Sequence, residues 1–222
     1  MLNDLTLYVN THSSAADCWK MFMRQLNRHW PSCPHIVVAT DLRRTSGQGI
    51  TYIDYSAAKK FSNQYLLGLC AVETTYVLTL QEDFILYDDV QDVLLQDAID
   101  GMNAENAACM RLIDSGRGLM YSMQATIWRT QALRQLYTTF EAETPWNAES
   151  LGSTSLHQLG WRCGQRRDDL LPMRGRDHRD SKVFSYIATA LVRGKWNKDY
   201  EKELRPLLEE YGIDSRIRGW TE

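Results

Sequence analysis

The sequence predicts an α/β protein in which helices flank a mostly parallel sheet. Short apolar runs rich in strand formers alternate along the chain with longer segments whose apolar residues recur at helical spacing. The apolar runs are nearly continuous, which is typical of parallel strands buried on both faces. A chain of 222 residues can build one sizeable core, so we expect a single domain over residues 1–222.

The first half of the chain alternates regularly between predicted strands and predicted helices. The expected strands are Leu5–Val9, His35–Thr40, Ile50–Tyr55 and Tyr76–Leu80. The expected helices are Ala15–His29, 59–73 and Asp88–Gly101. Pro31 ends the first helix, because proline cannot continue one.

The second half is less regular. We expect strands at Ala107–Ile113 and Leu119–Met123, and helices at Thr126–Tyr137 and from Pro145 onward. Proline suits the first position of a helix, where its missing N–H is not needed. Residues 164–182 predict a long arginine-rich loop, and Val183 to Tyr211 predicts two helices broken near Gly194.

The charge balance excludes several classes of protein. The formal net charge is −3, with 44% hydrophobic and 24% charged residues, which is ordinary for a globular domain and unlike a disordered chain. Such a chain lacks the basic footprint of a nucleic-acid binder, so we expect no nucleic-acid partner. Residues 1–110 are nonetheless acidic and residues 111–222 basic, which indicates either two differently solvated faces or two functional halves.

Cysteine usage and hydropathy indicate a reducing compartment. The five cysteines are an odd number without CxxC spacing, so they predict neither a disulfide framework nor a zinc knuckle. The residues Met1 to Leu5 do not resemble the start of a signal peptide, and no apolar run reaches the length of a membrane span. We therefore expect a cytoplasmic protein with no membrane span.

Several catalytic motifs are missing from the sequence. It contains neither GxGxxG nor GxxxxGK[ST], which argues against dinucleotide oxidoreductases and P-loop enzymes. It also lacks the GxSxG nucleophile elbow, which argues against that class of serine hydrolase.

The strongest chemical signal is Gln81-Glu82-Asp83 at the end of an apolar strand. In parallel sheets, ligands bind at the carboxyl ends of the strands. Carboxylates at such a position can hold a hard divalent cation, which prefers oxygen ligands and can bridge phosphate oxygens. The alternative is a solvated turn that caps the following helix.

Four segments, in order, resemble motifs of the GT-A nucleotide-sugar-dependent glycosyltransferases of the polysaccharide and lipopolysaccharide type. Leu80-Gln81-Glu82-Asp83-Phe84 is similar to the strand end that carries the DxD motif. The later segments are Ser122-Met123-Gln124-Ala125-Thr126-Ile127-Trp128, Pro145-Trp146-Asn147-Ala148-Glu149 and Gly194-Lys195-Trp196. The resemblance covers roughly Leu5 to Trp196, which is most of the chain.

This resemblance implies a GT-A, Rossmann-like fold with a nucleotide-binding half over 1–110 and an acceptor-side half with C-terminal helices over 111–222. It implies transfer of a hexosyl or deoxyhexosyl group from a nucleoside diphosphate-sugar to a saccharide acceptor, in polysaccharide biosynthesis. The implied stereochemistry is inversion, and the implied cofactor is Mn²⁺ or Mg²⁺. The alternative is a catalytically silent nucleotide- or glycan-binding module on the same fold, and a metal-dependent phosphoesterase is a third option.

The resemblance also implies roles for residues on the donor side. Thr11 and His12 would lie beside the nucleotide, and Asp41 would accept a hydrogen bond from the base, or else simply end its strand. Asp83 would bind the metal, and Glu82 would contact the nucleotide or reach the metal through water.

The first position of the DxD motif is Gln81, a neutral oxygen donor. That departure leaves three possibilities, which are weaker metal binding, a water-mediated contact from Glu82, or no metal. It is also the feature that favours the silent module.

The later half supplies the remaining predicted site residues. Arg176 and Arg179 would meet the diphosphate, because guanidinium groups match phosphate oxygens, and His178 would complete the metal shell. The alternative is an exposed surface loop. Glu149 would be the base that deprotonates the acceptor hydroxyl, or else a glutamate favoured by the helix dipole. Trp146 would offer a sugar platform, or else belong to the core.

Overall fold

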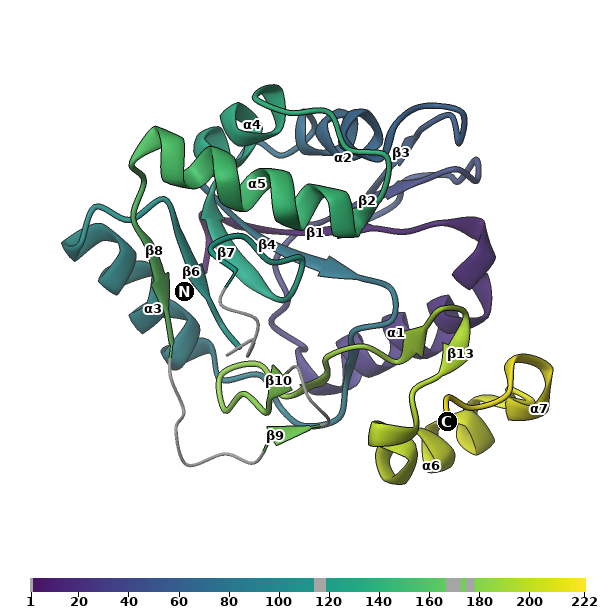
Figure 1. Ribbon diagram of the computed structural model, residues 1–222. Helices are drawn as coiled ribbons and strands as arrows, with labels where there is room; N and C mark the ends of the chain where they lie inside the picture. Colours follow the sequence, from purple (N-terminus) through teal and green to yellow (C-terminus); the bar gives the residue numbers. More distant parts are fainter. Residues whose placement is uncertain (1, 114–118, 167–172, 175–177) are drawn as a thin grey trace.

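The computed structural model describes residues 2–113, 119–166, 173–174 and 178–222. In these residues a seven-stranded sheet has the order β3-β2-β1-β4-β7-β6-β8 (Figure 1). Its strands are β1 (Leu5–Asn10), β2 (Ile36–Thr40), β3 (Ile50–Asp54), β4 (Tyr76–Gln81), β6 (Cys109–Arg111), β7 (Thr126–Arg129) and β8 (Cys163–Gln165). Only β7 runs antiparallel to its neighbours within this described sheet, so the predicted mostly parallel architecture is confirmed.

Helices cover both faces of the sheet, because strand residues alternate between them. One face packs against α1 (Ala16–His29) and α3 (Asp92–Ala104), and the other against α2 (Phe61–Leu69), α4 (Thr130–Thr138) and α5 (Pro145–Leu159) (Figure 1). Leu7 joins the first core and Tyr8 the second. The C-terminal α6 (Glu201–Tyr211) packs beside α1, and α7 (Ser215–Arg218) follows it.

Local sequence explains where α5 begins and ends. Thr144 is its N-cap, and the Thr144 hydroxyl accepts a hydrogen bond from the Asn147 backbone N–H. Pro145 occupies the first turn, as predicted. Gly160 ends the helix with a φ of 63°, a left-handed conformation that glycine adopts without a steric penalty.

The predictions for 119–137 are partly wrong. The predicted strand Leu119–Met123 is irregular, because its polar backbone groups bond to side chains of α5 in place of a neighbouring strand. The predicted helix Thr126–Tyr137 begins as the strand β7 and becomes helical only at Thr130. Thr126, Ile127 and Trp128 are strand formers, and β7 is buried between β4 and β6.

The prediction of two helices between Val183 and Tyr211 is wrong for its first half. β11 (Tyr186–Ile187) pairs with β5 (Ile85–Leu86), and β12 (Leu191–Val192) forms a hairpin with β13 (Lys195–Trp196). Arg193 and Gly194 form the turn with positive φ values of 52° and 80°. A short buried apolar run has no solvent-facing side, so its pattern cannot distinguish helix from strand. The predicted loop 164–182 likewise contains part of β8, together with β9 (Met173–Arg174) and β10 (His178–Arg179).

Among the described residues, no helix combines the length and the apolar character that crossing a bilayer requires. The described cysteines are free thiols.

Candidate functional site

The predicted donor-side residues meet at the carboxyl edge of the sheet. β1 lies between β2 and β4, with Asn10 in register with Ala39 on one side and Gln81 on the other. The turns that follow these three strands are therefore neighbours in space.

Asp41 and His12 form a pair in the turns after β2 and β1. The Asp41 carboxylate accepts hydrogen bonds from the Ser13 backbone N–H (2.7 Å) and the Ser13 hydroxyl (2.6 Å). His12 Nε2 lies 3.3 Å from Asp41 Oδ2, while His12 Nδ1 accepts from the Ser14 N–H, which puts the neutral ring's proton on Nε2. Burial opposes ionisation of Asp41, but the bonds from Ser13 outweigh it, so the pKa of this carboxyl lies below its ordinary value.

Thr11 links the β1 turn to the acidic strand end. Its buried hydroxyl accepts a 2.6 Å hydrogen bond from Trp19 Nε1, and it also lowers the pKa of the nearby Glu82 carboxyl. Its carbonyl accepts from the Tyr55 hydroxyl at 2.6 Å, and the Arg44 guanidinium stacks 4.7 Å from the centre of the Trp19 ring.

Glu82 and Asp83 are two adjacent carboxyls in a desolvated position. Asp83 is only 7% exposed, and its Oδ2 accepts a 3.2 Å hydrogen bond from the Leu191 backbone N–H. Burial raises the pKa of both carboxyls, and the charge of Asp83 adds to the rise at Glu82. The Thr11 hydroxyl and the His12 N–H bond to Glu82 and offset part of that rise.

The donor set of Gln81, Glu82 and Asp83 fits a hard divalent cation. All three offer oxygen ligands, and a cation would neutralise two carboxylates whose ionisation burial opposes. Within the described residues no cluster of three His, Cys, Asp or Glu side chains could hold a metal alone. A ligand such as a diphosphate would have to supply the remaining oxygens, as Mg²⁺ sites commonly require.

Arg218 of α7 is a neighbour of this edge that the sequence did not predict. Its guanidinium bonds to both Asp17 oxygens (2.6 and 2.5 Å), to the Ser14 carbonyl (2.6 Å) and to the Gly194 carbonyl (3.2 Å). Its bonds to Asp17 raise its pKa, and the nearby Glu82 adds to this. Arg218 thus ties the β1 turn to the β12–β13 hairpin.

Glu149 belongs to α5 and faces the segment that leads into β7. Glu149 Oε1 accepts from the Met123 backbone N–H (2.9 Å) and the Ser122 hydroxyl (3.2 Å). Because β7 runs antiparallel to β4, with Thr126 opposite Thr79, this segment reaches the carboxyl edge. Glu149 and Asp83 therefore flank the same edge from different elements.

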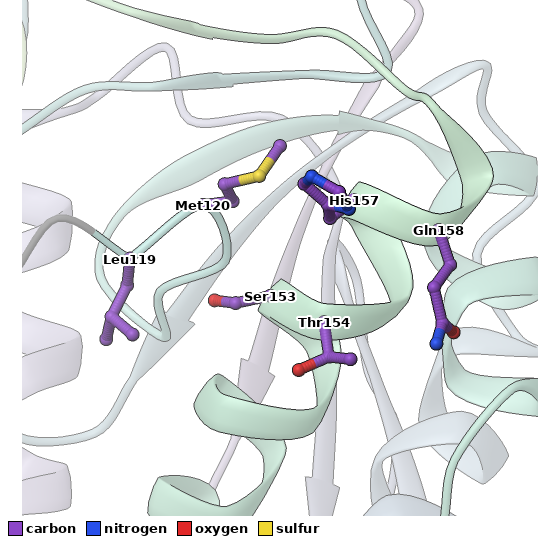
Figure 2. Close-up of a pocket in the computed structure, with 6 residues that line it drawn as sticks. All are labelled: Leu119, Met120, Ser153, Thr154, His157 and Gln158. Atoms are coloured by element: carbon purple, nitrogen blue, oxygen red, sulfur yellow. The ribbon is translucent and has the colours of Figure 1, made fainter.

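An open depression of about 420 Å³ lies further along α5. As Figure 2 shows, side chains of α5 and of the segment before β7 line it: Leu119, Met120, Ser153, Thr154, His157 and Gln158. Its lining mixes hydroxyl, amide and imidazole groups with two apolar side chains, and Ser153 joins the two walls through a 3.0 Å bond from the Tyr121 N–H.

Three further predicted residues, Arg176, His178 and Arg179, belong to the segment around β10. Arg176 lies outside the described residues. His178 and Arg179 form the backbone of β10, which pairs with β9, and their side chains also lie outside what the structure describes. Among the site residues that the sequence analysis did not name, only Ser13 could have been found from the sequence, because it stands in the polar turn beside His12.

Comparisons with known proteins give a fold and no family. No model of a known protein family matches the sequence, and no curated protein matches it. A solved cytidylyltransferase from Leptospira borgpetersenii serovar Hardjo-bovis is 13% identical with a TM-score of 0.53, over 99% of each chain. TarS residues 1–349 from S. aureus are 12% identical with a TM-score of 0.50, over 97% of this chain and 68% of that one.

A further solved structure is the mannosyltransferase PcManGT from Pyrobaculum calidifontis, in complex with GDP-Man and Mn²⁺. It is 11% identical with a TM-score of 0.52, and the match covers 78% of this chain and 58% of that one. The chain therefore spans little more than half of that mannosyltransferase. These likenesses confirm the predicted fold, so the chain has a GT-A-like, Rossmann-like α/β architecture.

Proposed function

We propose that the protein transfers a sugar from a nucleoside diphosphate-sugar to a saccharide or glycan acceptor. The observation that carries the proposal is the placement of two kinds of carboxylate at one edge of a GT-A-like sheet. Glu82 and Asp83 lie at and after the end of β4, and Glu149 of α5 bonds to the segment before β7, which reaches the same edge. In this proposal residues 1–110 form the nucleotide-binding half and residues 111–222 form the acceptor-side half, from which Arg176, His178 and Arg179 would also reach the donor diphosphate.

On the donor side, the nucleoside would lie beside Thr11, His12 and Asp41. The Asp41 carboxylate is already held by Ser13, so its role includes shaping the turn as well as meeting the base. Glu82 and Asp83, with His178, would hold Mn²⁺ or Mg²⁺, whose positive charge stabilises a leaving diphosphate when the ion is bound. Arg176 and Arg179 would add positive charge to the same diphosphate.

On the acceptor side, Glu149 would act as the general base. The Met123 N–H and the Ser122 hydroxyl hold Oε1, and no contact among the described residues engages Oε2. Oε2 would take the proton of the acceptor hydroxyl while its oxygen bonds to the sugar C1 and the bond from C1 to the diphosphate breaks. Attack from the face opposite the leaving group inverts the configuration at C1.

The surface along α5 suits a saccharide acceptor. Trp146 is 63% exposed and stands one helical turn before Glu149, where its indole face can stack against a sugar ring. The depression at Thr154 and His157 lies further along the helix, about 7 to 12 Å beyond Glu149 at 1.5 Å per residue. A glycan of several sugars would therefore contact both ends of this surface.

The test is turnover with a panel of UDP-, GDP-, CDP- and dTDP-sugars, with and without Mn²⁺. We expect release of the nucleoside diphosphate to depend on an added glycan, and Asp83→Ala and Glu149→Ala each to abolish it while the fold stays intact. Binding of a nucleotide-sugar with no turnover would favour the silent module. Absence of stabilisation by every nucleotide and nucleotide-sugar would overturn the proposal.

A second candidate is nucleotidyl transfer, in which CTP and a sugar give a CMP-sugar and pyrophosphate. The observation that favours it is the match to the Leptospira cytidylyltransferase over 99% of both chains. The products separate the two functions, since only nucleotidyl transfer consumes CTP and releases pyrophosphate.

A further inference from the structure

Two thiols face each other across neighbouring strands of the sheet. Cys109 in β6 and Cys163 in β8 are partners in parallel register, so their side chains point to the same face. Strands in a sheet lie about 4.8 Å apart, which is within the Cα separation of 4.4–6.8 Å, roughly, that disulfides span. Each thiol shifts the pKa of the other, as expected for sulfur atoms on paired positions of neighbouring strands.

The surroundings give the two thiols different reactivity. Cys109 is completely buried, and this burial raises its pKa well above the ordinary value. The half-buried Cys163 has a lowered pKa, because the Cys109 hydrogen bond and then the Arg111 guanidinium favour its thiolate over the opposing effect of burial. Arg111 is held close by, through its 2.5 Å bond to Gln165 of β8.

The strand that carries Cys163 can adjust its position. In the described sheet β8 is three residues long and lies at the edge, so it is paired with β6 alone. A disulfide needs a Cβ separation of about 3.8 Å, which is closer than a parallel pair usually provides. An outermost strand can make that approach without breaking a second ladder of hydrogen bonds.

We propose that Cys163 and Cys109 form a reversible oxidation site that reacts with peroxides. The Cys163 thiolate attacks a peroxide oxygen, the O–O bond breaks, and the sulfur becomes a sulfenic acid while water or an alcohol leaves. Cys109 then attacks that sulfur, the S–O bond breaks, and a second water leaves as the disulfide forms. In sum, two thiols are oxidised to one disulfide while one peroxide is reduced.

The expected consequence of oxidation is that β8 and the end of α5 are held more firmly against the sheet. Cys109 lies in the core that also contains Leu156 of α5, and Cys163, Leu159 and Trp161 pack against that core. Oxidation would fasten β8, and with it the end of α5, to β6. The proposal rests on the paired positions and the surroundings of the two thiols, and it holds whether or not the protein transfers sugars.

The experiment treats the folded, reduced protein with hydrogen peroxide and maps its peptides by mass spectrometry. We expect a linked pair of peptides that contain Cys109 and Cys163, and we expect dithiothreitol to separate them. Cys163→Ser should abolish the link and leave Cys109 unmodified. Cys70→Ser, which removes an exposed thiol elsewhere, should leave the link unchanged.

Two results would overturn the proposal. One is peroxide treatment that leaves Cys163 reduced, or that oxidises it to sulfinic acid with no bond to Cys109. The other is a link that forms no faster in the folded protein than in the same protein unfolded in urea, since the pairing would then owe nothing to the strand register. Both results are measured on the protein without substitutions, so neither depends on whether a variant folds.

Discussion

Asp83 Oδ2 accepts a hydrogen bond from the backbone N–H of Leu191, 3.2 Å away and 108 residues later in the chain. The bond joins the acidic end of β4 to the hairpin that contains the Gly194-Lys195-Trp196 segment. It also satisfies one lone pair of a carboxyl that is otherwise buried. The first of the four sequence motifs is therefore bonded to the hairpin that carries the last one, through Leu191 on the opposite strand of that hairpin.

Asp83→Asn should separate the role of the charge from the role of this hydrogen bond. The amide oxygen can still accept from Leu191, and a buried negative charge is removed, so the melting temperature of the metal-free protein should not fall. Transfer should fall by about 100-fold or more, because charge at the diphosphate is lost. Thermal melts and turnover assays measure both effects, with Asp97→Asn on the exposed face of α3 as the control.

Stability without metal should decrease as the pH rises from about 4 to about 8. Burial raises the folded pKa of Glu82 and Asp83 above the unfolded values near 4, so the folded state binds protons more tightly. The stability they contribute is complete below about pH 4 and is lost as the pH rises through the folded pKa values, up to about 8 for Glu82. Melting temperatures in EDTA across this range provide the measurement.

The variant carrying both Glu82→Gln and Asp83→Asn is the control for that pH dependence. Its melting temperature should vary less with pH than that of the unmodified protein, because the two titrating groups are gone. Equal slopes for the two proteins would assign the pH dependence to other groups.

Glu149→Gln should lower turnover by about 10²- to 10⁴-fold while donor binding is unchanged. The glutamine keeps an oxygen that can accept from the Met123 N–H and the Ser122 hydroxyl, so the segment before β7 should stay in place. Ser122→Ala removes one of those two bonds and should reduce turnover only a few-fold. Full activity in Glu149→Gln would eliminate this residue as the base.

The sequence predicted the elements that local patterns define, but not the contacts between residues far apart in the chain. The strands that end at Thr40 and Gln81 were predictable, because apolar runs and the polar turns after them are local patterns. The hairpin at Gly194 was not, because its short strands are buried and it is held by distant partners such as Asp83. The bonds from Arg218 to Ser14 and Asp17, about 200 residues away, have no local signal either.

Trp146→Ala should weaken acceptor binding and leave the stability unchanged. The side chain is 63% exposed, so its removal leaves no cavity in the core. The KM for the glycan acceptor should rise while the KM for the nucleotide-sugar stays constant. Leu151→Ala, at another exposed apolar position of α5, is the matched control and should change neither. A change in the KM for the nucleotide-sugar alone would contradict the prediction, because it would assign Trp146 to donor binding.

Arg218→Ala should destabilise the protein and loosen the donor edge together. It removes charge-assisted hydrogen bonds to Asp17 and to the Ser14 and Gly194 carbonyls, at a cost of about 1.5–3 kcal/mol. At roughly 2–4 °C per kcal/mol for a chain of this size, the melting temperature should fall by several degrees. Because Ser14 follows the turn of Thr11 and His12, the KM for the donor should rise as well.

Arg218→Lys should recover only part of both losses, since an ammonium cannot bond to Asp17 through two parallel N–H groups. Arg216→Ala, which removes an exposed arginine of the same helix that pairs with Asp214, should leave both quantities unchanged. A fall in stability with an unchanged donor KM would limit Arg218 to holding the C-terminal segment in place.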